Sequence, residues 1–431
     1  MFQMSRRNLL TATLAAPLAT QLTGFAAAQS AGGRSYPAGP DDERFWAAIA
    51  ANYDVTDDIT NVENGNWGLM ARPVLDAYKT HTERVNRENS YFARRAYWPI
   101  YMGVLEETAS RLGVSPEEIA FTRGATEALQ NIISGYNKLK QGDAVMIADL
   151  DYGSIMSTMR WKARQVGAET VEISIPEPAT HDVVIETYRA ALKQHPNTRL
   201  LLLTHISHRT GLVVPVREIA EIAHERGVDV VVDAAHSWGQ MDFEAPDLGA
   251  DFIGFNLHKW IGAPIGVGAM YIRPDRLGAI DPNMSAGPDE ASSIHGRVHT
   301  GTSNFAAYMS VPDAFAFQDR MGWPQKAARL SYLRNLWVAP CRAVDGIDIL
   351  TPDDERMHAG ITSFRFRGMI SEEDNKAIAA YLLDRHGVFT VHRNGVTAGA
   401  CVRVTPSYYN SAEDMSRAAD AILDARTHFL G

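Results

Sequence analysis

The sequence contains little cysteine, no excess of positive charge and no long apolar run in its interior. Two cysteines, Cys341 and Cys401, among 431 residues exclude a disulfide framework and a cysteine metal cluster, and it is open whether these two pair. The formal net charge of −10 argues against an extended nucleic-acid surface. The interior offers no transmembrane segment. The length nevertheless allows two domains and a large core.

The first residues have the composition of an export signal. Arg6 and Arg7 precede a mainly apolar stretch, and the small residues before Ala28 suit a cleavage site. Paired arginines in SRRNLL resemble a twin-arginine signal, which is an address for export rather than an anchor. We therefore expect residues 1–28 to be a signal peptide, read by the Tat export machinery, and the mature protein to be periplasmic. The alternative, an uncleaved membrane helix, is disfavoured by the threonines and prolines.

The rest of the chain divides into three predicted parts. Residues 29–59 form a Gly/Pro-rich arm followed by a helix. Residues 60–315 alternate apolar runs with helical segments, which predicts an α/β domain with a mostly parallel seven-stranded sheet. Residues 316–431 contain amphipathic helices and few strands, which predicts a smaller α+β domain. The seven expected strands are EIAFT, AVMIAD, TVEISI, RLLLLTH, VDVVVDA, DFIGF and GVGAMYI, the last close enough to its predecessor to pair antiparallel.

One lysine stands inside an apolar, glycine-rich stretch, DFIGFNLHKWIGAPIGVGAM. Lys259 could point into water, as most lysines do, or its desolvated amine could serve as a nucleophile or form a Schiff base. Upstream, the apolar strand VVVDA ends at Asp233, an acid that is costly to bury unpaired. Open α/β sheets bind ligands at the carboxyl ends of their strands, which is where these residues fall.

The turn after the first of these strands offers a place for an anion. Gly124 permits a tight turn, and the N–H groups of Ala125 and Thr126 would face an anion at the helix N-terminus. The alternative is that Thr126 merely caps the helix. Asn256 and His258, beside the lysine, could also hold phosphate oxygens.

A lysine, an acid and a phosphate cradle are the three parts of a pyridoxal 5′-phosphate (PLP) site. In such a site Asp233 would pair with the protonated pyridine nitrogen, and the small Ala235 would let the ring lie flat. Tyr152 could stack on the ring or be a surface residue. Ser207 and His208 could supply hydrogen bonds. We expect no metal site, because His205 and His208 have no carboxylate or cysteine at suitable spacing.

Together these motifs resemble class V of the fold-type I PLP-dependent enzymes, which includes cysteine desulfurases, isopenicillin N epimerase-like proteins and serine-type aminotransferases. GATEAL looks like the family's phosphate turn, DAAH its pyridinium acid with His236 beside it, and HK its Schiff-base lysine. The resemblance implies the fold-type I architecture and a homodimer. It also implies the remaining roles: Tyr152 in ring stacking, Ser207 and His208 on the hydroxyl side of the ring, Thr302 as a phosphate contact from a partner subunit, Arg403 as the clamp on a substrate carboxylate and Asn66 in the substrate loop.

Two departures shape the expected function. Cys341 falls in a helical pattern and Cys401 in a strand, whereas desulfurases carry their cysteine on a flexible loop, and the export signal is unusual for a mostly cytoplasmic family. Exported relatives that tailor siderophore peptides have a similar layout. We expect a PLP-dependent enzyme that acts on a small-molecule or peptide substrate with an amine and a carboxylate, by aminotransferase-type chemistry. The alternatives are an epimerase or lyase and a non-catalytic PLP- or amine-binding protein. A hydrolase ranks last, because the sequence lacks a G-x-S-x-G motif.

Overall fold

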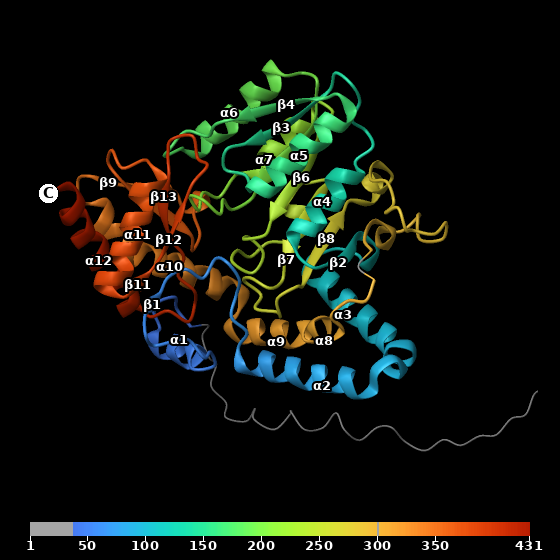
Figure 1. Ribbon diagram of the computed structural model, residues 1–431, viewed down its shortest axis with the longest axis horizontal. Coiled ribbons are helices and arrows are strands. Elements are labelled where there is room, and N and C mark those ends of the chain that lie inside the picture. Colours follow the sequence, from blue (N-terminus) through green and yellow to red (C-terminus); the bar gives the residue numbers. More distant parts are fainter. Residues whose placement is uncertain (1–37, 300) are drawn as a thin grey trace, which may run out of the picture. The chain divides into compact units, whose positions relative to one another are not determined.

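The computed structural model describes residues 38–299 and 301–431, and Gly39–Gly431 form one compact unit (Figure 1). The expected signal peptide, residues 1–28, lies outside the described residues. No helix within the described ranges combines the length and apolarity that a bilayer crossing requires.

A seven-stranded sheet forms the centre of the larger part of this unit. The strand order is β2-β8-β7-β6-β5-β3-β4. The neighbours from β7 to β4 pair in parallel, and β8 pairs antiparallel with both β7 and β2. The predicted α/β class and the antiparallel seventh strand are therefore confirmed. The strands are β2 (Ile119–Thr122), β3 (Ala144–Ala148), β4 (Glu169–Ile173), β5 (Thr198–Thr204), β6 (Asp229–Ala234), β7 (Phe252–Asn256) and β8 (Gly268–Ile272).

Helices cover both faces of this sheet because its strands are apolar on both sides. Along β3, Val145 and Ile147 belong to the hydrophobic cluster that contains α4 (Ala125–Gly135) and α5 (Gly153–Val166). The alternate residues of β3 belong to the cluster that contains α6 (His181–Gln194) and α7 (Val216–His224). This is the two-sided burial expected of parallel strands. The carboxyl ends of the strands remain free for a site.

A second sheet, of four antiparallel strands, belongs to the smaller C-terminal part. Its order is β12-β13-β10-β9, formed by β9 (Ile347–Ile349), β10 (Thr362–Phe366), β12 (Val391–Arg393) and β13 (Cys401–Val404). The helices α10 (Trp323–Arg342), α11 (Glu372–His386) and α12 (Ala412–Leu430) share one hydrophobic cluster with it. A large, mostly parallel sheet with a smaller C-terminal α+β part is the predicted architecture.

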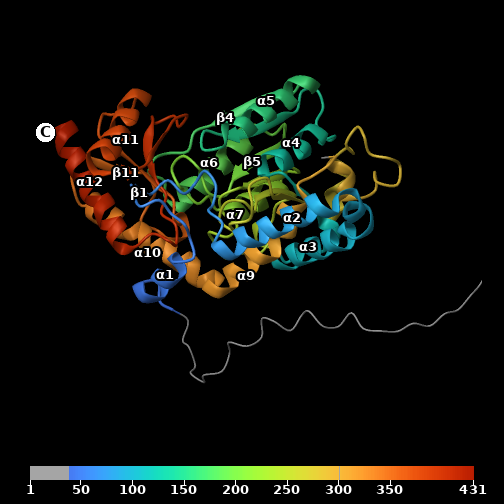
Figure 2. The same cartoon turned by 60° about the horizontal axis from the view of Figure 1, so that its bottom comes forward.

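The structure differs from the sequence reading in some details. The segment VFTVHR, read as one unit, contains two strands in different sheets: β11 (Val388–Phe389) pairs with the short β1 (Thr60–Asn61), and β12 pairs with β13. Helix α9 (Val311–Met321) runs through the domain boundary that we expected at 315/316. The division into domains at that position stays a prediction. Helix α2 (Arg72–Arg95) lies beside α8 (Phe305–Met309) and α9 (Figures 1 and 2). The other helices are α1 (Glu43–Ala50) and α3 (Tyr97–Arg111).

Candidate functional site

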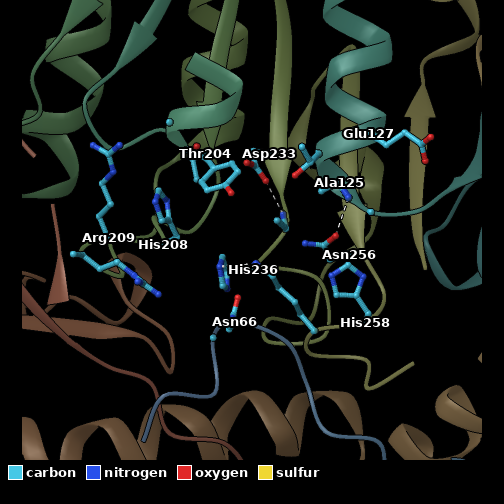
Figure 3. A pocket seen from close by; sticks show the side chains of 18 of the residues that line it. Asn66, Ala125, Glu127, Thr204, His208, Arg209, Asp233, His236, Asn256 and His258 are labelled. Carbon is cyan, nitrogen blue, oxygen red and sulfur yellow. Dashed lines mark hydrogen bonds between the residues drawn. The ribbon is translucent and has the colours of Figure 1, made fainter. Parts of the chain in front are cut away.

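A cavity of about 760 Å³ opens at the carboxyl ends of the central strands, within the range typical of small-molecule sites (Figure 3). Strand ends β5, β6 and β7, the start of α4 and the smaller sheet all contribute to its wall. The sequence-predicted residues that line it are Asn66, Gly124, Ala125, Thr126, Tyr152, His208, Asp233, Ala235, His236, Asn256, His258, Lys259 and Arg403.

The amine of Lys259 lies in this cavity, partly buried, and contacts a histidine. Its Nζ lies 2.9 Å from Nε2 of His236. On the other side of the imidazole, the indole N–H of Trp260 donates to Nδ1 over 3.4 Å. An imidazole whose Nδ1 accepts this bond carries its proton on Nε2 and can donate it to the uncharged form of the lysine amine. Burial lowers the pKa of Lys259 to about 8, so the neutral, nucleophilic amine is more populated near neutral pH than in an ordinary lysine.

Asp233 lies near the end of β6, buried and with little compensation for its charge. Its Oδ1 accepts the N–H of Ala235 over 2.9 Å. Desolvation raises the pKa of Asp233, against the opposing effects of that N–H and of Lys259. A buried carboxylate of this kind would be stabilised by a cationic N–H partner in the cavity.

The first turn of α4 forms another part of the wall. Asn256, the last residue of β7, accepts the N–H of Ala125 with its Oδ1 over 2.8 Å (Figure 3). A Cβ at Gly124 would lie 3.0 Å from that oxygen and 3.2 Å from Cε1 of His258, so a larger residue would crowd the cradle. The His258 ring is oriented by a 2.9 Å bond between Nδ1 and the carbonyl of Val267. Backbone N–H groups at a helix start beside a histidine suit a phosphate.

Two rings meet on another side of the cavity. Tyr152 and His208 pack edge to face, with ring centroids 5.2 Å apart and planes at 88°. Nδ1 of His208 is buried without a hydrogen-bond partner among the described residues. Ser207 does not line the cavity, because its hydroxyl oxygen accepts the N–H groups of Arg209 and Thr210 in its own turn.

Arg403 reaches the cavity from β13. Its Nη1 donates to the carbonyl of His208 over 2.7 Å, and its Nη2 contacts both carboxylate oxygens of Glu63 at 2.6 and 2.8 Å. Asn66 is brought to the cavity by the loop after Glu63, where the N–H of Gly68 donates to the carbonyl of His258 over 2.9 Å. Thr302 is exposed and lies outside the cavity that this chain lines.

Several cavity residues were not identified from the sequence. Arg393 and Asn394 come from the end of β12, and Thr204 ends β5. The alternation of β12 and β13 could have pointed to Arg393, since it lies on the same face of the sheet as Arg403. The remaining cavity residues outside the predictions are Gly65, Arg123, Glu127, Gln130, Gly153 and Arg209.

These features fit PLP by their chemistry. Lys259 supplies the amine, Asp233 the acid for the pyridine nitrogen, and Gly124 keeps the phosphate cradle open. The unpartnered Nδ1 of His208 is available to a polar group on the ring. Each of these residues lines the same cavity, as the sequence motifs required.

Comparison with known proteins also points to a PLP-dependent enzyme family. Residues 71–417 match the family model "Aminotransferase class-V". Isopenicillin N epimerase of Amycolatopsis lactamdurans is 28% identical over 404 residues, which is 88% of this chain and 98% of that protein. A cysteine desulfurase from Thermococcus onnurineus NA1 has the same fold (TM-score 0.75, 20% identity, 89% of this chain and 98% of that one). So does a mutant of the enzyme C-DES with glycine covalently linked to its PLP cofactor (TM-score 0.73, 21% identity, 85% and 97%). The chain belongs to the class-V aminotransferase family, whose cofactor is PLP.

Proposed function

We propose that this protein removes the α-proton of a substrate that carries an amine and a carboxylate and delivers a proton to the opposite face of the same carbon, so that the outcome is epimerisation. The observation that carries the proposal is the amine of Lys259, which lies in the cavity 2.9 Å from Nε2 of His236 and has its pKa lowered to about 8. A neutral lysine is the form that accepts a proton. Bound PLP supplies the electron sink that makes the α-proton acidic.

Several residues in and beside the cavity have separate tasks in this proposal. Lys259 takes the proton from the α-carbon, and the His236–Trp260 pair holds the amine in place. Asp233 keeps a proton on the pyridine nitrogen. Arg403 orients the substrate through its carboxylate, which suits the planar donor fork of a guanidinium. The N-terminus of α4 holds the phosphate.

Desulfurase chemistry, which some relatives perform, needs a reactive thiol. Both cysteines are fully buried. Burial raises the pKa of Cys341 to about 12 and that of Cys401 to about 11, so neither is a thiolate near neutral pH. Cys401 lies in β13 and its thiol faces the carbonyl of Arg209 rather than the cavity. These positions favour proton transfer over sulfur transfer.

Transamination, which the sequence led us to expect, uses the same residues and is the rival outcome. The similarity to an isopenicillin N epimerase over nearly its whole length supports epimerisation. The test is to incubate the holoenzyme with single enantiomers of an amino-acid and peptide panel. Loss of stereochemical purity without keto-acid formation supports the proposal. Stoichiometric keto acid would establish transamination instead, and neither product would favour a binding protein.

We also propose that the active form is an exported homodimer. The exposure of Thr302 outside this chain's cavity is compatible with a contact to the partner's cofactor. Light scattering of the holoenzyme tests the dimer, and Thr302→Ala should weaken PLP binding if the contact exists. Replacement of both Arg6 and Arg7 by lysine should retain the protein in the cytoplasm, as cell fractionation would reveal.

A further inference from the structure

Two arginines, not one, face the cavity from the smaller sheet. Strands β12 and β13 are antiparallel, with Val391 opposite Arg403. Arg393, two residues further along β12, therefore projects from the same face as Arg403, as a diagonal neighbour about 7–8 Å away between Cα atoms. Both arginines line the cavity.

A single carboxylate holds this pair from outside the cavity. Oε1 of Glu63 lies 2.6 Å from Nη2 of Arg403 and 3.3 Å from Nη2 of Arg393. The Glu63 side chain is only 8% exposed and does not line the cavity. One negative charge thus faces two positive charges, and the group as a whole presents a surplus cation to a ligand.

The two guanidinium groups lie at different depths. The side chain of Arg403 is 1% exposed and that of Arg393 is 25% exposed. Arg403 also donates to the carbonyl of His208 over 2.7 Å, whereas the contacts of Arg393, to Glu63 and to the carbonyl of His392, are long at 3.3 and 3.4 Å. The Nε atoms of both are buried and have no partner among the described residues. Of the two arginines, Arg393 therefore has the weaker hydrogen bonds and lies nearer to solvent.

We propose that Arg393 is a second carboxylate-binding residue and that the substrate is an amine with two carboxylates. This inference rests on the proposed function, in which Arg403 binds the carboxylate next to the reacting carbon. Arg393 then binds the second carboxylate, further out. A site built to pair a partly buried cation discriminates against an analogue that leaves the cation unpaired.

The test measures binding without turnover. Glutarate has two carboxylates and no amine, and its monoamide has the same length with one carboxylate replaced by a neutral amide. Titration calorimetry of the wild-type holoenzyme should give at least tenfold tighter binding of glutarate. Arg393→Gln should reduce this preference to less than threefold. Arg367→Gln removes a charge from an exposed ion pair with Asp345 in the same part of the chain and should leave the preference unchanged.

Equal affinity of the wild-type holoenzyme for glutarate and its monoamide would overturn the inference, whether or not the variant folds. An Arg393→Gln protein that weakens both ligands equally, with its cofactor absorbance intact, would overturn it as well. The proposed function is read separately in the same preparation: a reduced PLP adduct on Lys259 reports the PLP chemistry, and loss of stereochemical purity without keto acid reports epimerisation. A missing adduct with the glutarate preference intact would refute the PLP chemistry and leave recognition of two carboxylates standing.

Discussion

Nζ of Lys259 lies 2.9 Å from Nε2 of His236, and the indole of Trp260 fixes the opposite nitrogen of the same ring. The contact of Trp260 with Nδ1 favours the tautomer that carries its proton on Nε2, where the histidine can donate to a neutral lysine amine. Desolvation lowers the pKa of Lys259, and a hydrogen bond donated by His236 would stabilise the free amine further.

Replacement of the histidine tests this relationship. His236→Phe removes the donor, so we expect the pKa of Lys259 to rise from its value of about 8. One hydrogen bond contributes about 1 kcal/mol, or somewhat less than one pKa unit. The measurement is the pH dependence of PLP addition to apo-protein. Trp260→Phe removes the N–H that favours one tautomer of His236 but keeps the imidazole. It should shift the pH dependence of PLP addition in the same direction by a smaller amount. An unchanged pH dependence of PLP addition in His236→Phe would show that the histidine does not influence the pKa of Lys259.

The burial of Lys259 should also appear in the stability of the apo-protein. The pKa of Lys259 is about 8 in the folded state, and an unfolded lysine has a pKa of about 10.4. Between these values the unfolded chain binds more protons, so stability rises with pH. The penalty is fully present below about pH 8 and disappears above about pH 10.4. Relative to Lys259→Met, the wild type should gain about 3 kcal/mol across this window in urea denaturation, whereas a constant difference would contradict the burial of the amine.

Removal of the charge on Asp233 should weaken cofactor binding. Asp233→Asn removes the charge from the hydrogen bond to the pyridine nitrogen. Such a charge-assisted bond contributes about 1.5–3 kcal/mol, so PLP should bind about 10- to 100-fold more weakly. Spectroscopic titration of apo-protein measures this. Asp229→Asn, at the other end of β6 and outside the cavity, is the matched control and should leave PLP affinity within about threefold. An equal loss in both variants would indicate a structural effect.

The cysteines should be dispensable for catalysis. Because both thiols are buried and have raised pKa values, Cys341→Ala together with Cys401→Ala should retain activity within about twofold and lose only modest stability. Turnover of the preferred substrate and thermal melting are the two measurements. A folded double variant with less than a tenth of the activity would bring a thiol mechanism back into consideration.

The sequence contained much of this site because the strand ends of an α/β sheet converge. Asp233, Asn256 and Lys259 each follow an apolar run, so their meeting could be expected. Arg393 was missed because it closes a strand of only three residues, whose pairing and face depend on β13. Glu63 was missed for a related reason. Its contact with Arg403 joins residues 340 positions apart, and no local sequence pattern predicts a contact of that kind.

The central claim is that Lys259 holds PLP covalently. The direct measurement is borohydride reduction of the purified holoenzyme, followed by proteolysis and mass spectrometry. We expect one reduced pyridoxyl-phosphate adduct, located on Lys259 and absent from Lys259→Ala. An adduct on another lysine, or none at all in protein that contains stoichiometric PLP, would contradict the account.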